Sequence, residues 1–216
     1  MKVLLTELAL PCLVASAFAG TRAVVPFLPE HTGKTFCGNL LWQPGLTLLA
    51  PPLVYAYRCT NVAVRNCVIN DGHSMLSIGS ELSGGIRNVL MEDCRAEKEV
   101  NKIFFVKTNP ERGGFVENVT MRRIKALDVK YEAVSAITDY FWKPGSVPLD
   151  GILRATPVRN IVLEDISASS AKAVYAFRGY ETEPIRGLRL RNVKVGKVRK
   201  PSSAEFVEDF KGDDMQ

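Results

Sequence analysis

The chain has 216 residues, of which 46% are hydrophobic and 24% charged, and its formal net charge is +5. This usage is typical of a folded globular protein and excludes an intrinsically disordered chain. No apolar run reaches the roughly 18 residues of a membrane-spanning helix. The mild positive charge suits an acidic ligand but is too weak to indicate nucleic-acid binding. The spacing of the five cysteines and two histidines does not match a zinc site, so we expect no metal and no cofactor.

The first 20 residues have the pattern of a secretory signal peptide. Lys2 gives a positive start, a mostly apolar stretch follows, and Ala17-Phe18-Ala19 has the small-x-small form of a cleavage site. Glu7 lies inside the apolar stretch and fits poorly, and the alternative is an ordinary N-terminal helix. We expect a signal peptide over residues 1–19 and therefore a secreted or periplasmic protein.

Five segments between residues 61 and 195 repeat one pattern. They begin at Asn61, Asn88, Asn118, Asn160 and Gly187, so their starts are 27, 30, 42 and 27 residues apart. Periods of this size indicate stacked units. Apolar residues occupy the second, fourth, seventh and ninth positions. The spacing of two within each half predicts strands with one face inward, and the step from fourth to seventh predicts a bend or bulge.

Two polar columns of the repeat predict stacking in sequence order. The fifth position reads Arg65, Glu92, Arg122, Glu164 and Arg191, so the sign alternates. Parallel strands lie about 4.8 Å apart, which would place each charge beside its opposite. The first position holds four asparagines and one glycine; Asn tolerates unusual backbone angles and can form a ladder with its equivalents.

The seventh position of the first two repeats holds Cys67 and Cys94. They could form a disulfide or fill the apolar column as Ile124 and Ile166 do in later repeats. We favour packing, because a free cysteine behaves as a small hydrophobe.

A second apolar strand follows each of the first four segments. These strands are expected at Met75–Ile78, Ile103–Lys107, Ser135–Asp139 and Val174–Arg178. Neither the spacing of a leucine-rich repeat nor a helical period is present. We therefore predict an all-β parallel β-helix, a solenoid of about five rungs over residues 59–200. Residues 20–58 would cap one end, and the polar tail 201–216 would cover the other or be partly disordered.

The longest repeat contains an insertion, roughly from Tyr140 to Ile152. Pro144 and Pro148 disfavour regular structure, so we predict a protruding loop. Its aromatic residues Phe141 and Trp142 leave two interpretations open. They could stack on sugar faces, or they could form a hydrophobic plug over the coil.

Several motifs share one family resemblance. Gly72-His73-Ser74 is followed by Ile78-Gly79-Ser80-Glu81 and then by Ser83-Gly84-Gly85. Further on stand Phe105-Val106-Lys107, a Gly-rich exit that begins at Arg112, and Ile137-Thr138-Asp139-Tyr140. Together they resemble the Gly-His-Gly region, the Arg-Ile-Lys region and the tyrosine-bearing strand of glycoside hydrolase family 28, the polygalacturonases. The resemblance covers about residues 59–200 and implies a right-handed parallel β-helix, which agrees with the repeat.

The resemblance implies inverting hydrolysis of glycosidic bonds in pectin-type acidic polysaccharide, a reaction that needs two carboxyl groups. The residues it implies for catalysis are His73 and Asp71. His73 would orient the catalytic acids or touch the sugar. Asp71 is the best substitute acid near it, although Asp at such a position is also typical of a turn cap.

The substrate-binding residues implied by the resemblance are Lys107, Tyr140, Glu81 and Arg112. Lys107 would pair with a substrate carboxylate and Arg112 would add positive charge. Tyr140 would stack or hydrogen-bond, and a core tyrosine is the alternative. Glu81 would lie near the substrate or hold the Gly84-Gly85 turn.

The chain also departs from the family pattern. The Asn-Thr-Asp and Asp-Asp motifs, which carry the catalytic carboxylates, are missing, as if rungs between about Pro44 and Cys59 were lost. Ser74 replaces the second glycine of Gly-His-Gly, and Phe105 replaces the arginine of Arg-Ile-Lys. The alternative function is therefore a non-catalytic β-helix that binds acidic polysaccharide.

A pectate lyase shares the fold but needs a calcium cluster of carboxylates, which the sequence does not indicate. We expect an acidic polysaccharide such as polygalacturonate as the partner, with no nucleic acid and no membrane. We expect the protein to be a monomer.

Overall fold

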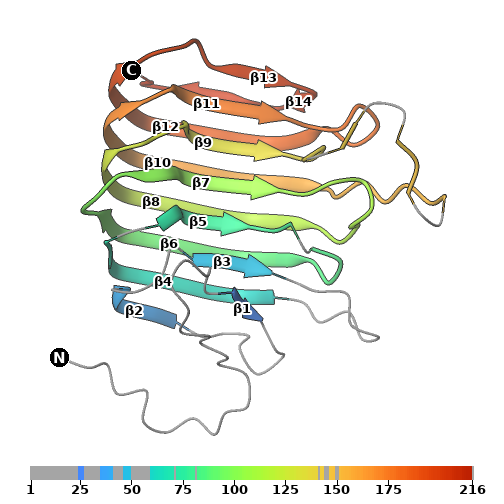
Figure 1. The fold of residues 1–216 in the computed structure, drawn as a ribbon, viewed down its shortest axis with the longest axis horizontal. Coiled ribbons are helices and arrows are strands. Elements are labelled where there is room, and N and C mark those ends of the chain that lie inside the picture. Colours follow the sequence, from blue (N-terminus) through green and yellow to red (C-terminus); the bar gives the residue numbers. More distant parts are fainter. Residues whose placement is uncertain are drawn as a thin grey trace, which may run out of the picture.

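The computed structural model describes residues 59–70, 72–80, 82–140, 142–143, 146–148 and 151–215, and the backbone of three short strands before them. The described chain is built from strands in two parallel sheets (Figure 1). Sheet A has the order β1-β3-β5-β7-β9-β11-β13. Sheet B has the order β14-β12-β10-β8-β6-β4-β2, with β15 paired to β12.

The five repeated segments are consecutive strands of sheet B. They are β4 (Cys59–Ile69), β6 (Ile86–Ala96), β8 (Val116–Asp128), β10 (Val158–Ala171) and β12 (Ile185–Val198). Each pairs in parallel with the next, and repeat positions pair with their equivalents, as Val62 does with Val89. The predicted stacking in sequence order is confirmed.

The second strand of each repeat lies in sheet A. These strands are β5 (Gly72–Ile78), β7 (Val100–Lys107), β9 (Glu132–Ile137) and β11 (Ala173–Arg178). They pair in parallel and in chain order, as predicted. The strand predicted to end at Asp139 ends at Ile137, so Thr138 and Asp139 lie in the segment that leaves the sheet.

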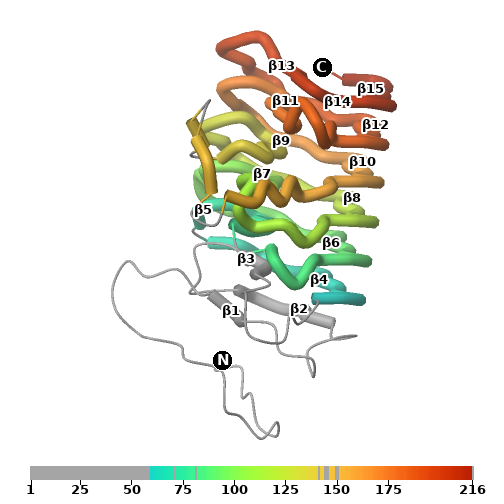
Figure 2. The backbone as a smooth tube through the Cα atoms, turned by 90° about the vertical axis from the view of Figure 1, so that its right-hand side faces the viewer, coloured from blue at the N-terminus to red at the C-terminus, as the bar shows by residue number. Residues whose placement is uncertain are grey.

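Further strands extend both sheets beyond residues 59–200. At one end they are β1 (Val24–Pro26), β2 (Thr35–Leu40) and β3 (Leu46–Leu49). At the other end they are β13 (Ser203–Glu205), β14 (Val207–Glu208) and β15 (Lys211–Asp213). Since β13 pairs with β11 while β14 and β15 pair with β12, part of the polar tail forms another turn of the coil (Figure 2).

The protein is therefore an all-β, right-handed parallel β-helix, as predicted. Within the part of the chain that the structure describes, no helix is long and apolar enough to cross a membrane.

The core lies between the two sheets and is built from the apolar columns of the repeat. Val64, Met91, Met121, Leu163 and Leu190 fill the fourth position and are fully buried. Cys67 and Cys94 are buried thiols in the seventh column, and the Cys67 amide donates to Cys94 Sγ at 3.4 Å. The predicted packing role of these two cysteines is confirmed.

Residues in the left-handed backbone conformation occupy two fixed positions in each of the five repeated strands of sheet B, and they bend the strand there. Asn61, Asn88, Asn118 and Asn160 have φ of 55–56°, and Gly187 occupies the same position with φ 70°. The residues at the sixth position also have a positive φ; they are Asn66, Asp93, Arg123, Asp165 and Asn192. This second bend is the predicted break between the fourth and seventh positions. The first column also forms the predicted ladder, since Asn88 Nδ2 donates to Asn61 Oδ1 at 2.9 Å and Asn118 Nδ2 to Asn88 Oδ1 at 3.0 Å.

Candidate functional site

The outer face of sheet A collects most of the predicted site residues that the structure describes. Strands β5, β7, β9 and β11 run side by side across the front of Figure 1. Residues from His73 to Arg178 therefore lie along one sheet although they are spread over about 100 positions of sequence. We name its two ends by their residues: the histidine end, where the strands begin, and the tyrosine end, where they finish.

The tyrosine end brings Lys107 and Tyr140 together. The backbone amide of Tyr140 donates to the carbonyl of Thr108, the residue after Lys107, at 2.8 Å. Lys107 Nζ lies 5.6 Å from the centroid of the Tyr140 ring and 5.8 Å from that of Phe105. The two rings meet edge to face at 5.7 Å. Lys107 is buried, so its ammonium group is held between two aromatic faces, each of which attracts a cation.

Phe105 links this group to the other end of the sheet. Its register neighbours on either side are Ser77 and Ser135, whose buried hydroxyls make no hydrogen bond with described residues. Lys102 Nζ lies 5.0 Å from the Phe105 centroid. The Phe105 ring thus lies between Lys102 and Lys107.

At the histidine end, the side-chain amide Nδ2 of Asn101 donates a hydrogen bond to His73 Nδ1 at 2.8 Å. Beside it, Glu132 accepts from Lys102 Nζ at 2.5 Å and from Lys172 Nζ at 2.7 Å. Burial opposes the ionisation of Glu132, but the two ammonium groups outweigh it and lower its pKa to about 2. Burial lowers the pKa of Lys102, and Glu132 partly offsets this effect.

The structure does not bring His73 to the tyrosine end. His73 lies beside Asn101 on β7, and Lys107 is six residues further along that strand. Six residues of extended strand span roughly 20 Å. His73 and the pair formed by Lys107 and Tyr140 therefore lie at opposite ends of one surface.

Arg112 lies in the loop that follows β7. The loop folds against the segment before β10, because Gly113 donates to the carbonyl of Arg154 at 2.9 Å and Arg154 to that of Pro110 at 2.6 Å. Arg112 itself is half-buried. Two further predicted site residues, Asp71 and Glu81, lie outside the described residues, so their roles stay predictions.

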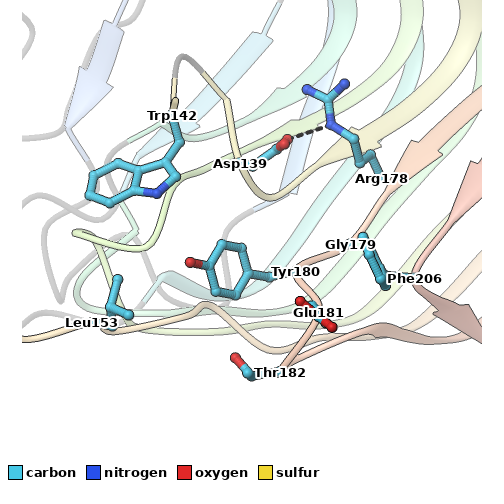
Figure 3. Close-up of a pocket in the computed structure, with 9 residues that line it drawn as sticks. All are labelled: Asp139, Trp142, Leu153, Arg178, Gly179, Tyr180, Glu181, Thr182 and Phe206. Carbon is cyan, nitrogen blue, oxygen red and sulfur yellow. Dashed lines mark hydrogen bonds and ion pairs between the residues drawn. The ribbon is translucent and has the colours of Figure 1, made fainter. Parts of the chain in front are cut away.

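An open pocket of about 360 Å³ lies beyond the tyrosine end (Figure 3). Trp142 from the insertion and Tyr180 from the segment after β11 line it, together with Leu153 and Phe206. Asp139 and Arg178, also in its wall, form an ion pair at 2.7 Å. Trp142 thus faces a cavity among other aromatic side chains, whereas Phe141 lies outside the described residues.

Two of the described acids on this face are already paired with cations. Glu132 binds two lysines and Asp139 binds Arg178. Asp93 lies on sheet B, has a left-handed backbone conformation and forms an ion pair with Arg123. No three described His, Cys, Asp or Glu side chains gather closely enough to hold a metal ion.

Sequence reasoning missed Lys102, Glu132, Arg178 and Tyr180. The first two could have been found, because the repeat register brings the beginnings of β7 and β9 together and makes them close neighbours. The repeat register could not indicate Arg178 and Tyr180, because the pocket that they line depends on the path of irregular segments after β9 and β11.

Comparisons with known proteins agree with this architecture. The family model described as "Glycosyl hydrolases family 28" matches residues 54–210. A protein described as a probable polygalacturonase from Vitis vinifera is 25% identical over 139 residues, which are 62% of this chain and 26% of that protein. The crystal structure of a hyperthermoactive exopolygalacturonase from Thermotoga maritima matches with a TM-score of 0.65 and 23% identity, over 74% of this chain. The chain spans about a quarter of the plant relative and 35% of the Thermotoga chain.

Proposed function

Because the chain belongs to glycosyl hydrolase family 28, we propose that it acts on pectin-type acidic polysaccharide and that the outer face of sheet A is its contact surface. The observation that carries the proposal is the position of Lys107 between the Phe105 and Tyr140 rings. A uronic-acid chain offers a carboxylate on each sugar and an apolar face on each ring. A lysine beside aromatic side chains is complementary to both features.

The proposed reaction is hydrolysis of the glycosidic bond with inversion. Such hydrolysis uses a protonated carboxyl group that donates to the leaving oxygen and an ionised one that activates water, about 6.5–9.5 Å apart. In this proposal Asp71 is one acid, and His73, held by Asn101, contacts the sugar or orients that acid. Glu81 and Arg112 complete the proposed contacts with substrate.

A specific observation favours a second candidate, a β-helix that binds acidic polysaccharide without cleaving it. Two described carboxylates of this face, Glu132 and Asp139, each form ion pairs with basic side chains. The low pKa of Glu132 prevents it from carrying a proton near neutral pH. Glu132 is therefore not suited to donate a proton to a leaving group.

The deciding experiment measures reducing-sugar release from polygalacturonate by the purified 216-residue chain, with His73→Ala beside it. Retention of the protein by the same polymer is measured in parallel for the wild type, Lys107→Gln and Tyr140→Ala. Lys125→Gln is the matched control, because Lys125 is exposed on strand β8 of sheet B.

Each outcome has a distinct meaning. Release that is lost in His73→Ala supports hydrolysis. Retention without release, weakened by Lys107→Gln and not by Lys125→Gln, supports the binding function. Absence of both release and retention contradicts the proposal in either form.

We also propose that the protein is secreted or periplasmic and monomeric, since pectin-type polymers belong to cell walls outside the plasma membrane. The N-terminal sequence of the protein recovered outside the cytoplasm tests the location. A mature chain that begins at Gly20 supports the proposed leader, and a chain found only inside the cell contradicts it. Light scattering of the purified chain tests the oligomeric state.

A further inference from the structure

A second basic surface lies where the chain turns from sheet B into sheet A. In three successive turns this edge carries Lys130, Tyr131, Lys172, Arg199 and Lys200. We name this group the basic corner. We infer that the basic corner is a second contact surface for acidic polysaccharide, separate from Lys107 and Tyr140; this inference rests on the proposed function.

Backbone hydrogen bonds fix the members of the basic corner in a column. The amide of Lys172 donates to the carbonyl of Tyr131 at 2.9 Å, and those of Arg199 and Lys200 donate to the carbonyl of Lys172 at 3.1 and 2.7 Å. Arg199 Nη2 also donates to the carbonyl of Lys130 at 2.8 Å. Because successive rungs of a parallel coil are about 4.8 Å apart, the corner presents a regular row of cations.

The basic corner surrounds an exposed aromatic ring. Tyr131 is 40% exposed. Lys130 Nζ lies 5.6 Å and Lys102 Nζ 5.8 Å from its ring centroid. An exposed tyrosine among cations offers a stacking face for a sugar and positive charge for its carboxylate.

The basic corner carries more positive than negative side chains. Glu132 is the carboxylate paired within the group, and it binds Lys102 and Lys172. Lys130, Arg199 and Lys200 are exposed at the surface. The preceding turn, at Glu97, Lys98 and Glu99, is acidic overall, so the positive surface begins at Lys130.

The basic corner is linked to the candidate site by a chain of side-chain contacts. Tyr131 contacts Lys102, Lys102 contacts Phe105, and Phe105 contacts Lys107 and Tyr140. A polymer long enough to cover sheet A can therefore touch both groups. This continuity favours a polysaccharide over an unrelated polyanion such as a nucleic acid, which charge alone would also attract.

The test compares Lys130→Gln/Lys200→Gln and, separately, Tyr131→Ala with the wild type in binding to polygalacturonate. The matched control is Lys125→Gln/Lys197→Gln, which removes two exposed lysines from sheet B strands. We expect the corner double variant to weaken binding about fivefold at low salt, as the loss of two exposed charge contacts predicts. The difference should shrink at high salt because ions screen exposed charges. Tyr131→Ala should weaken binding at both salt concentrations.

The outcomes separate this inference from the function on which it rests. Wild-type binding that is reduced by Lys107→Gln but equal in the corner and control double variants overturns the basic corner alone. A wild type that does not bind polygalacturonate overturns both. Tighter binding to a DNA oligonucleotide than to polygalacturonate, lost in the corner variant, overturns the assignment of polysaccharide as the occupant.

Discussion

Arg65 and Glu92 are 27 residues apart in sequence and directly opposite one another on neighbouring strands, with Arg65 Nε 2.5 Å from Glu92 Oε1. Glu92 also accepts from Arg122 and Arg123. Its side chain is only 8% exposed. Hydrogen bonds, led by that from Arg122, outweigh the effect of burial and lower the pKa of Glu92 from 4.5 to about 2.

We predict that Glu92→Gln lowers the free energy of unfolding at neutral pH by about 2 kcal/mol, between the values for surface and buried ion pairs. Because the pKa of Glu92 is lower in the folded state, its stabilising effect is complete above about pH 4.5 and is lost as the pH falls towards 2. Urea unfolding at several pH values should show the wild type and the variant converging in acid. Glu97→Gln, at an exposed pair with Arg95, is the control and should change little. Equal losses in both variants would count against this account.

The asparagine ladder gives a second prediction. Asn118 has φ 56° and is hydrogen-bonded to Asn88 and to Asn160. Asn118→Ala should lower the free energy of unfolding by about 2 kcal/mol, because alanine is strained in this conformation and cannot join the ladder. Asn118→Gly should lose only about half as much, because glycine adopts positive φ without a steric penalty. Thermal or urea unfolding checks both, and equal losses would show that backbone conformation is not the cause.

Phe105 and its neighbours give a third prediction. Ser135 Oγ is buried beside Phe105 without a hydrogen bond to any described residue. Ser135→Ala should leave stability unchanged or raise it by about 1 kcal/mol, because no bond is lost and a buried polar group is removed. Ser74→Ala should instead lower stability by about 1 kcal/mol, since the buried Ser74 hydroxyl donates to the carbonyl of His73 at 2.7 Å. A clear loss in Ser135→Ala would mean that its hydroxyl has a partner.

The Gly-rich loop after β7 gives a fourth prediction. Gly114 has φ 66°, and a Cβ there would overlap the backbone oxygen of Leu82. Gly114→Ala should lower the free energy of unfolding by about 3 kcal/mol or more, because both the conformation and the space exclude a side chain. Gly151 has a similar φ of 71° but open space around its Cβ position, so Gly151→Ala isolates the conformational cost of about 1 kcal/mol. Denaturant midpoints compare the two directly, and similar losses would contradict the packing argument.

The sequence by itself predicted the parallel coil because a solenoid repeats its contacts. Each repeat contacts the equivalent positions of the adjacent rung. The apolar columns, the Asn column and the alternating charges can therefore be predicted by aligning the repeats, without knowledge of long-range contacts. The pairing of Arg65 with Glu92 followed from that register alone. The motifs around His73 and Lys107 indicated the family for the same reason, since each is local in sequence.

Only the tertiary structure decided how those residues divide across sheet A. His73 is the second residue of β5 and Lys107 is the last residue of β7, so their separation depends on strand pairing and strand length rather than on motif identity. The pocket that joins Trp142 to Tyr180 depends on irregular segments that leave adjacent rungs. The sequence therefore determined the repeating scaffold, because its contacts are periodic. The structure decided the functional surface, because its residues come from turns and strand ends that follow no period.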